Sequence, residues 1–256
     1  MLISTKCPTL IKAIEQDLKA GYSAVIQLVS TDEALLDRRL AEIPASQHND
    51  IQVDVTPREY LFDYLIKAFP VQLHTVWTDK EGVEHSKPAT DADGNPIFCT
   101  EAIAQRDELI ESLALLPPIP SALDQLVQHF GYEQVAECTG RSKRIIREVN
   151  DCSDKLVVQK RSANANLAEA RAFQNDQKQI LIFSQAGGTG RSYHADLSAK
   201  NQRLRRHYLL ESGWRADEAV QGLGRTNRSN QKQPPVFVVV STDVKGEKRF
   251  TSTISR

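Results

Sequence analysis

Short blocks of apolar residues alternate along this chain with longer segments in which apolar positions recur every three or four residues. The blocks predict strands at 24–29, 134–137, 179–183, 207–210 and 236–240. The longer segments predict helices at 8–20, 57–68, 101–116, 121–130, 167–173 and 216–224. Because the blocks are continuously apolar rather than alternating, both faces of their sheet should be covered. The pattern therefore predicts an α/β fold with a parallel sheet and helices on both faces.

One stretch, at about 71–100, departs from this pattern. Residues 71–77 alternate between apolar and polar, and turn sequences follow at 80–82 and 93–96. We expect a polar β-hairpin inserted into a single domain that otherwise spans 1–256. Asp91 and Asp93 do not begin a calcium loop, because Pro96 stands where that loop needs its glycine. No metal ligand is predicted anywhere in the chain.

Composition narrows the class of protein only a little. The four cysteines are scattered and no apolar run is long enough to cross a membrane, so we expect an intracellular protein without a membrane partner. The net charge of −1 does not indicate a nucleic-acid-binding protein. Two basic runs, 141–147 and 200–206, each hold four cationic residues and are candidate contacts for a phosphate backbone.

A glycine-rich run follows the predicted strand at 179–183. Gly187, Gly188 and Gly190 would permit a tight turn and a close approach of backbone N–H groups to an anion. Ligands of open α/β sheets bind at the carboxyl ends of strands, which is where this run lies. The run is not a P-loop, since GxxxxGK[ST] occurs nowhere in the sequence. A tight connection between strand and helix, with no ligand, fits the glycines equally well.

A pair of arginines follows further along. Arg225 and Arg228 stand three residues apart, so on a helix they share one face. A paired cationic group suits a terminal phosphate whose negative charge grows in a transition state. Gln221, one turn earlier, would be placed to orient a water molecule. The alternative is a solvated basic helix end that the helix dipole favours.

Together, the two runs resemble motifs V and VI of superfamily 2 helicases. The chain is similar to the strawberry notch family, a helicase-like group that includes proteins from bacteria and their phages. The segments that carry the likeness are 116–124, 139–142, 186–196, 199–202, 221–231 and 246–250. The resemblance implies the second, C-terminal RecA-like lobe of a superfamily 2 helicase, located in the cytoplasm of a bacterial or phage-infected cell.

The same likeness implies a role for each matching residue. Arg225 and Arg228 would reach the γ-phosphate of ATP, and Gln221 would help to order the attacking water. Further positions at the nucleotide would be Gly188, Gly190, Asp196 and Gly224. Contacts to a nucleic-acid backbone would come from Thr139, Gly140, Arg141, Ser184, Gly187, Thr189 and Arg191.

In such enzymes ATP sits between two lobes, and the first lobe supplies the P-loop and the acidic Mg²⁺ motif. Asp32 and Glu33 imitate that acidic motif, but without a P-loop upstream we interpret them as a helix cap. We therefore expect a P-loop-containing N-terminal lobe as partner, encoded in the same gene or on a separate chain. The track would be DNA, with RNA as the alternative. We expect the chain alone to hydrolyse no ATP. It would be a fragment, a split gene product or one subunit of a two-chain enzyme.

Two other functions compete with this interpretation. The basic runs also fit a non-catalytic remnant or accessory protein that only binds nucleic acid. A small-molecule enzyme is disfavoured, because no GxGxxG follows an early strand. His194 and Trp214 are expected to be packed side chains rather than a catalyst and a base-stacking surface.

Overall fold

The computed structural model describes residues 2–42, 44, 58–115, 120–150, 153–188 and 190–254. Its contacts divide the chain into two compact units. One unit comprises Met1–Val55 and Pro120–Arg256, and the other comprises Thr56–Ile119. Within the described ranges, no helix has both the length and the apolar character needed to cross a membrane.

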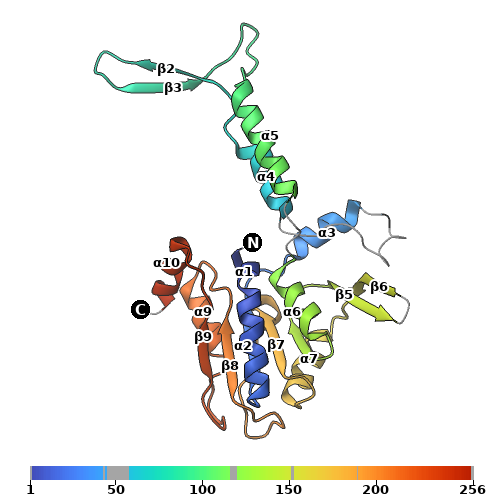
Figure 1. The fold of residues 1–256 in the computed structure, drawn as a ribbon. Coiled ribbons are helices and arrows are strands. Elements are labelled where there is room, and N and C mark those ends of the chain that lie inside the picture. The colour runs from blue at the N-terminus through green and yellow to red at the C-terminus, as the bar shows by residue number, and fades with distance from the viewer. Residues whose placement is uncertain are drawn as a thin grey trace. The chain divides into compact units, whose positions relative to one another are not determined.

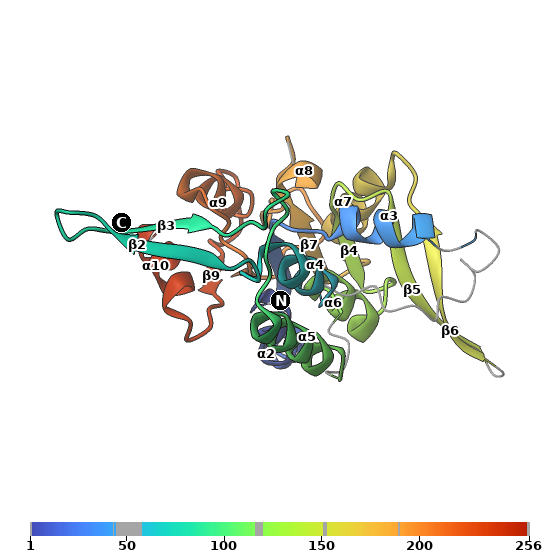
Figure 2. The same ribbon diagram turned by 90° about the horizontal axis from the view of Figure 1, so that it is seen from above.

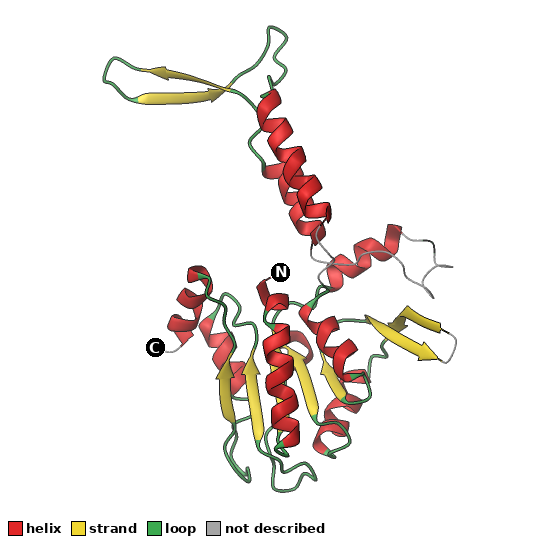
Figure 3. Ribbon diagram, viewed as in Figure 1, coloured by secondary structure: helices red, strands yellow, loops and turns green. Residues whose placement is uncertain are grey.

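The first unit is built on a five-stranded sheet whose strands all run parallel (Figures 1 and 3). In spatial order these are β4 (Val135–Cys138), β7 (Ile180–Ser184), β1 (Ser23–Leu28), β8 (Arg205–Leu209) and β9 (Val236–Val239). The predicted parallel sheet is confirmed, and every one of these strands was expected from its apolar block. The first strand of the chain lies in the middle of the sheet, with later strands added on both sides.

Helices cover both faces of this sheet (Figures 1 and 2). On one face, α2 (Cys7–Lys19) and α6 (Ala122–Phe130) pack on strand residues such as Ile26 and Ile182. On the other, Phe173 of α7 (Ala165–Gln174) packs with Val25 and Leu181. The helix α9 (Ala216–Leu223) lies on this second face, near the carboxyl ends of the strands. The result is the predicted α/β, RecA-like arrangement.

The first unit contains further elements that the sequence pattern did not all predict. They are α1 (Leu2–Thr5), α3 (Glu33–Glu42), α8 (Gln185–Gly188), α10 (Lys245–Ile254), and an antiparallel hairpin of β5 (Lys143–Asn150) and β6 (Ser153–Lys160). The hairpin packs on α3 through Ile145, Leu36 and Leu40. Strand β5 does not stand out in the sequence because charged residues interrupt its apolar positions. The expected glycine turn begins as the single helical turn α8.

The second unit consists of two helices and a hairpin. The helices α4 (Arg58–Ala68) and α5 (Thr100–Leu115) contact each other. The strands β2 (His74–Thr78) and β3 (Glu84–Pro88) pair antiparallel, and Trp77 stacks on His85 across them with ring centroids 5.4 Å apart. The hairpin expected at 71–100 is therefore present. It shares its compact unit with both neighbouring helices, so that unit is longer than the expected insertion.

Candidate functional site

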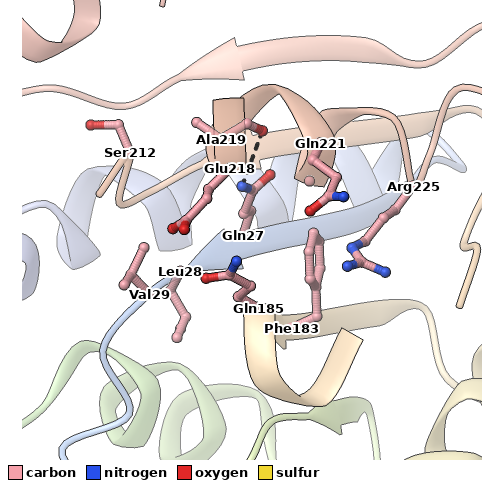
Figure 4. A pocket seen from close by; sticks show the side chains of 11 residues that line it. Gln27, Leu28, Val29, Phe183, Gln185, Ser212, Glu218, Ala219, Gln221 and Arg225 are labelled. Atoms are coloured by element: carbon pink, nitrogen blue, oxygen red, sulfur yellow. Dashed lines mark hydrogen bonds between the residues drawn. The ribbon is translucent and has the colours of Figure 1, made fainter. Parts of the chain in front are cut away.

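The candidate site lies where β1, β7 and β8, three adjacent strands, reach their carboxyl ends. A small hollow there is lined by residues of β1, β7, α8 and α9 and of the segments that follow β1, β8 and α9, among them Gln27, Phe183, Gln185, Gln221 and Arg225 (Figure 4). The chain adds β4 and β7 on one side of β1, and then β8 and β9 on the other. Such a switch in direction is where open α/β sheets bind ligands.

The two sequence motifs meet at this hollow. The backbone N–H of Tyr193 donates a hydrogen bond of 2.7 Å to the carbonyl of Arg225. In return, Nη1 of Arg225 donates one of 3.2 Å to the carbonyl of Arg191. A little further on, the N–H of Lys232 donates to the carbonyl of Ala195 at 2.9 Å. The glycine run and the arginine segment are therefore one hydrogen-bonded assembly.

Arg225 is held in a largely buried position. Only 6% of its surface is exposed, and its guanidinium lies 5.9 Å from the centre of the Phe183 ring. Burial is the main cause of a lowered pKa of Arg225, and the positive charge of Arg228 acts in the same direction. A cation that has already lost much of its water interacts more strongly with an incoming anion than a solvated one does.

The helical geometry predicted for the two arginines is wrong. Helix α9 ends at Leu223, and Gly224 is its C-cap, so both arginines lie beyond the helix. Arg225 sits in a turn in which its N–H donates to the carbonyl of Gly222 at 3.0 Å. Arg228 is exposed, and its N–H donates to Oε1 of Gln231 at 3.1 Å. The two side chains are therefore presented by a turn and by the irregular segment after it, which a three-residue spacing alone does not reveal.

Gln221 and its neighbour Gly222 have different roles in the structure. Gln221 lies in the last turn of α9, is exposed, and lines the hollow together with Arg225 (Figure 4). A Cβ on Gly222 would lie 2.2 Å from Nε2 of Gln27, so glycine lets α9 approach β1 closely. The amide of Gln27 in turn donates to the carbonyl of Ala219 at 3.2 Å. Neither Gly222 nor Gln27 was predicted, although a glycine inside a helix is a signal of close packing.

Within the glycine run, Gly187 packs closely against protein. A Cβ on Gly187 would lie 2.2 Å from the carbonyl oxygen of Cys138 and 2.5 Å from Cα of Thr139. Gly187 therefore lets α8 meet the end of β4 backbone to backbone. Gly188 ends α8, and Gly190 has a φ of 72°, a left-handed conformation that favours glycine. Thr189 lies outside the described residues.

Other residues of this run shape the loop after α8. Ser184, the last residue of β7, is buried, and its hydroxyl has no hydrogen-bond partner among the described residues. The carboxylate of Asp196 accepts hydrogen bonds from the hydroxyl and the N–H of Ser198 and from Nε2 of His194 at 3.0 Å. These bonds, those from Ser198 first, lower the pKa of Asp196 to about 2. The side chain of His194 is thus held by a carboxylate.

The turn at 139–141 presents little of its charge outward. Arg141 is 3% exposed, and its guanidinium bonds Oε1 of Glu137 at 2.6 Å and Oδ1 of Asp124 at 2.7 Å. The hydroxyl of Thr139, also buried, donates to Glu137 at 2.6 Å. Burial opposes ionisation of Glu137, but the charges of Arg141 and Arg161 and the hydrogen bonds from Arg141 and Thr139 together outweigh it and leave the pKa of Glu137 lowered. Of the predicted nucleic-acid contacts in this turn, only Gly140 is exposed.

Comparison with known proteins identifies the family of this chain. A family described as "C-terminal domain on Strawberry notch homologue" matches residues 121–256, more than half of the chain. The chain belongs to the strawberry notch family. It is 36% identical over 164 residues to "Protein strawberry notch" of Drosophila melanogaster, which is 60% of this chain and 10% of that protein. It is also 40% identical over 144 residues to "Protein strawberry notch homolog 1" of Homo sapiens, which is 54% of this chain and 10% of that protein.

This membership establishes a helicase-like C-terminal domain and locates it in the fold. The match begins at α6 and includes β4, β7, β8 and β9, together with both motifs of the hollow. The central strand β1, which supplies Gln27 to the hollow, precedes the matched segment. The strawberry notch domain in this chain therefore uses residues before 121 to complete its sheet.

The two basic runs are used largely inside the first unit. Arg203 pairs with Asp176 at 2.8 Å, and Arg206 pairs with Asp17 at 3.2 Å. Arg205 is 1% exposed and donates to backbone carbonyls and to Asn201. Charge that is already paired within the protein contributes less to a phosphate-binding surface than sequence counts suggest.

Trp214 and Arg161 differ from what the sequence suggests. Trp214, expected to be packed, is 86% exposed on the segment between β8 and α9. Arg161 was not predicted to matter, yet it donates to the carbonyls of Glu137 at 2.6 Å and of Arg141 at 2.9 Å. No local pattern marks Arg161, because its partners are about twenty residues away in the chain.

Proposed function

We propose that this chain is the second motor lobe of an ATP-dependent nucleic-acid helicase or translocase of the strawberry notch family. The observation that carries the proposal is the direct link between the loop at 191–193 and Arg225 at the carboxyl edge of the sheet. Arg225 stabilises the charge that develops on the γ-phosphate, Arg228 assists it, and Gln221 orders the attacking water.

The chemistry of the hollow suits a phosphate from a shared nucleotide. A largely buried guanidinium and amide side chains line it, and these groups are hydrogen-bond donors that an oxyanion accepts. The sequence contains no P-loop, so in this proposal the triphosphate and Mg²⁺ are held by a partner lobe that carries those motifs. ATP supplies the free energy, and this chain supplies positive charge to its terminal phosphate.

The same link offers a route from nucleic acid to ATP. In the proposal, the loop after α8 contacts the nucleic-acid backbone. A shift of that loop moves the carbonyl of Arg191 and the N–H of Tyr193, both of which are bonded to Arg225. Binding of a strand is thereby coupled to the placement of the arginine without an intermediate element.

The test uses the full chain supplied with the P-loop lobe of a strawberry notch relative, either mixed or fused. Nucleic-acid-stimulated ATP hydrolysis is measured with DNA and with RNA. Arg225→Ala should lower kcat by about 10³-fold or more, the scale of an arginine finger. Arg215→Ala is the matched control, because this exposed arginine stands before the start of α9 and pairs with Asp217 at 2.7 Å.

Two results would contradict the proposal. One is an unchanged kcat in Arg225→Ala. The other is arginine-dependent hydrolysis by the chain without any partner lobe. Salt-dependent binding to nucleic acid with no effect of nucleotide, and no hydrolysis in the presence of the partner lobe, would instead favour the non-catalytic binding protein.

A further inference from the structure

A buried hydrogen-bond chain joins the core of the sheet to the residue that follows Arg225. His207, in the middle of β8, has none of its surface exposed, and neither has Thr226. Nδ1 of His207 lies 2.7 Å from the hydroxyl of Thr226. That hydroxyl donates in turn to the carbonyl of Leu223, the last residue of α9, at 3.1 Å. Strand, turn and helix end are therefore connected through one hydroxyl group.

The direction of the chain follows from proton counting. A threonine hydroxyl has one proton, and here it points to Leu223, so the bond to His207 must be donated by the ring N–H at Nδ1. Nε2 is buried and has no hydrogen-bond partner within the described ranges, so a proton there would be an unpaired donor and the ring is the neutral tautomer with a bare Nε2. The rings of Phe183 and Phe237 lie with centroids 5.7 and 5.6 Å from that of His207. Such apolar surroundings favour the neutral form.

The backbone of the turn that this hydrogen-bond chain holds is closed on α9 and on a neighbouring loop. The N–H groups of Arg225 and Thr226 bond to carbonyls of α9 at 3.0 and 3.2 Å, which closes the turn on its own helix. The contacts of Arg225 to residues 191 and 193 tie it to a loop. The bond from His207 reaches the turn from β8, and the Arg225 guanidinium lies against the Phe183 ring of β7.

We propose that His207 and Thr226 are positioning residues that fix the turn of Arg225 to the sheet. Neither touches the nucleotide. Their bond sets where the backbone of residue 225 lies relative to β8, and hence where the guanidinium meets a phosphate. A displacement of about 1 Å at a catalytic group can cost about 100-fold in rate, so a short bond from a rigid strand matters here. This inference rests on the proposed function of Arg225.

The test compares substitutions that differ by one hydroxyl or one donor group. Thr226→Val keeps the shape and removes the hydroxyl, whereas Thr226→Ser keeps the hydroxyl. His207→Leu removes the donor, whereas His207→Asn retains one near the position of Nδ1. In the chain supplied with a P-loop lobe, Thr226→Val and His207→Leu should lower kcat about 10- to 100-fold with KM changed less than about twofold. The Ser and Asn variants should recover most of the rate.

A double substitution shows whether the effect passes through Arg225. In an Arg225→Ala background, Thr226→Val should cause no further loss, because the group that it positions is gone. A purely structural role would lower kcat by the same factor in both backgrounds, and that result would overturn the proposal. An unchanged kcat for Thr226→Val in the otherwise wild-type protein would also overturn it.

A second measurement uses the full chain without a partner lobe. Amide hydrogen exchange at Arg225 and Thr226 should be faster in Thr226→Val than in Thr226→Ser, by about 10-fold or more. If the wild-type pair of lobes shows no stimulated hydrolysis, the proposed function fails while exchange still tests the bond. If hydrolysis is normal and exchange is the same in both variants, the positioning proposal alone fails.

Discussion

Gly187 provides a decisive test of how the glycine run is used. A Cβ at this position would lie 2.2 Å from the oxygen and 2.4 Å from the carbon of the Cys138 carbonyl, and 2.5 Å from Cα of Thr139. All three are backbone atoms, so no flexible side chain can move aside. In Gly187→Ala, the end of β4 and α8 would have to separate by about 1 Å to restore van der Waals contact.

The expected cost follows from this geometry. Overpacking a close contact typically costs about 1–3 kcal/mol, and a clash with backbone on the neighbouring element belongs at the upper end, about 2–3 kcal/mol. For a chain of this size, that loss lowers Tm by about 5–10 °C. Gly246→Ala is the matched control, because Gly246 lies in α10 and a Cβ added there would meet no atom within 4 Å. That change should stabilise the protein by up to about 1 kcal/mol, since alanine is the better helix former.

The assay is chemical and thermal denaturation of the full chain followed by circular dichroism, with nucleic-acid binding measured in parallel. The two alanine variants should shift stability in opposite directions. If Gly187→Ala is as stable as the wild type and instead weakens binding to nucleic acid, the reasoning is refuted. The glycine would then serve the close approach of a ligand rather than of β4.

Two further predictions concern buried charge and pH. Arg141→Met should destabilise the protein by about 3–5 kcal/mol in urea denaturation, because it leaves the buried carboxylate of Glu137 without its closest counter-charge. Addition of Glu137→Gln should recover much of this loss. A cost of Arg141→Met below about 1 kcal/mol would show that the pair is not structural. Burial lowers the pKa of His207 from 6.5 to about 3, so between these values the unfolded chain binds a proton that the folded chain does not. The free energy of unfolding should therefore fall as pH drops from about 7.5 to 5, by about 2 kcal/mol more in the wild type than in His207→Asn. Equal pH dependence of the free energy of unfolding in the two proteins would contradict a buried neutral ring.

Much of the fold could be predicted because its signals are local. Each strand of the sheet overlaps a short apolar block, and blocks such as 179–183 and 236–240 are recognisable within about five residues. The pairing of the glycine run with the arginine segment pointed to the family before any geometry was known. The contact between Tyr193 and Arg225 shows the two motifs side by side.

The predictions that were wrong have a common physical cause. Whether a charged side chain is exposed, and where a helix ends, depend on partners that are distant in the chain. Arg141 and Arg225 look alike in sequence. Arg141 neutralises a buried acid, whereas Arg225 lines the hollow at the carboxyl edge. Arg206 is paired with Asp17, a residue from the other end of the chain. A spacing of three residues suggested a helical pair, but α9 stops before both arginines.

The sequence by itself therefore determined the class of fold, the order of its strands along the chain and the two motifs of the strawberry notch family. These depend on periodicity and on residue types within short windows. Only the tertiary structure decided which cations face outward, that Gly187 and Gly222 serve close packing, and that His207 reaches the turn of Arg225. Those outcomes depend on which atoms meet after strands distant in sequence have been placed side by side, and short windows of sequence do not encode that.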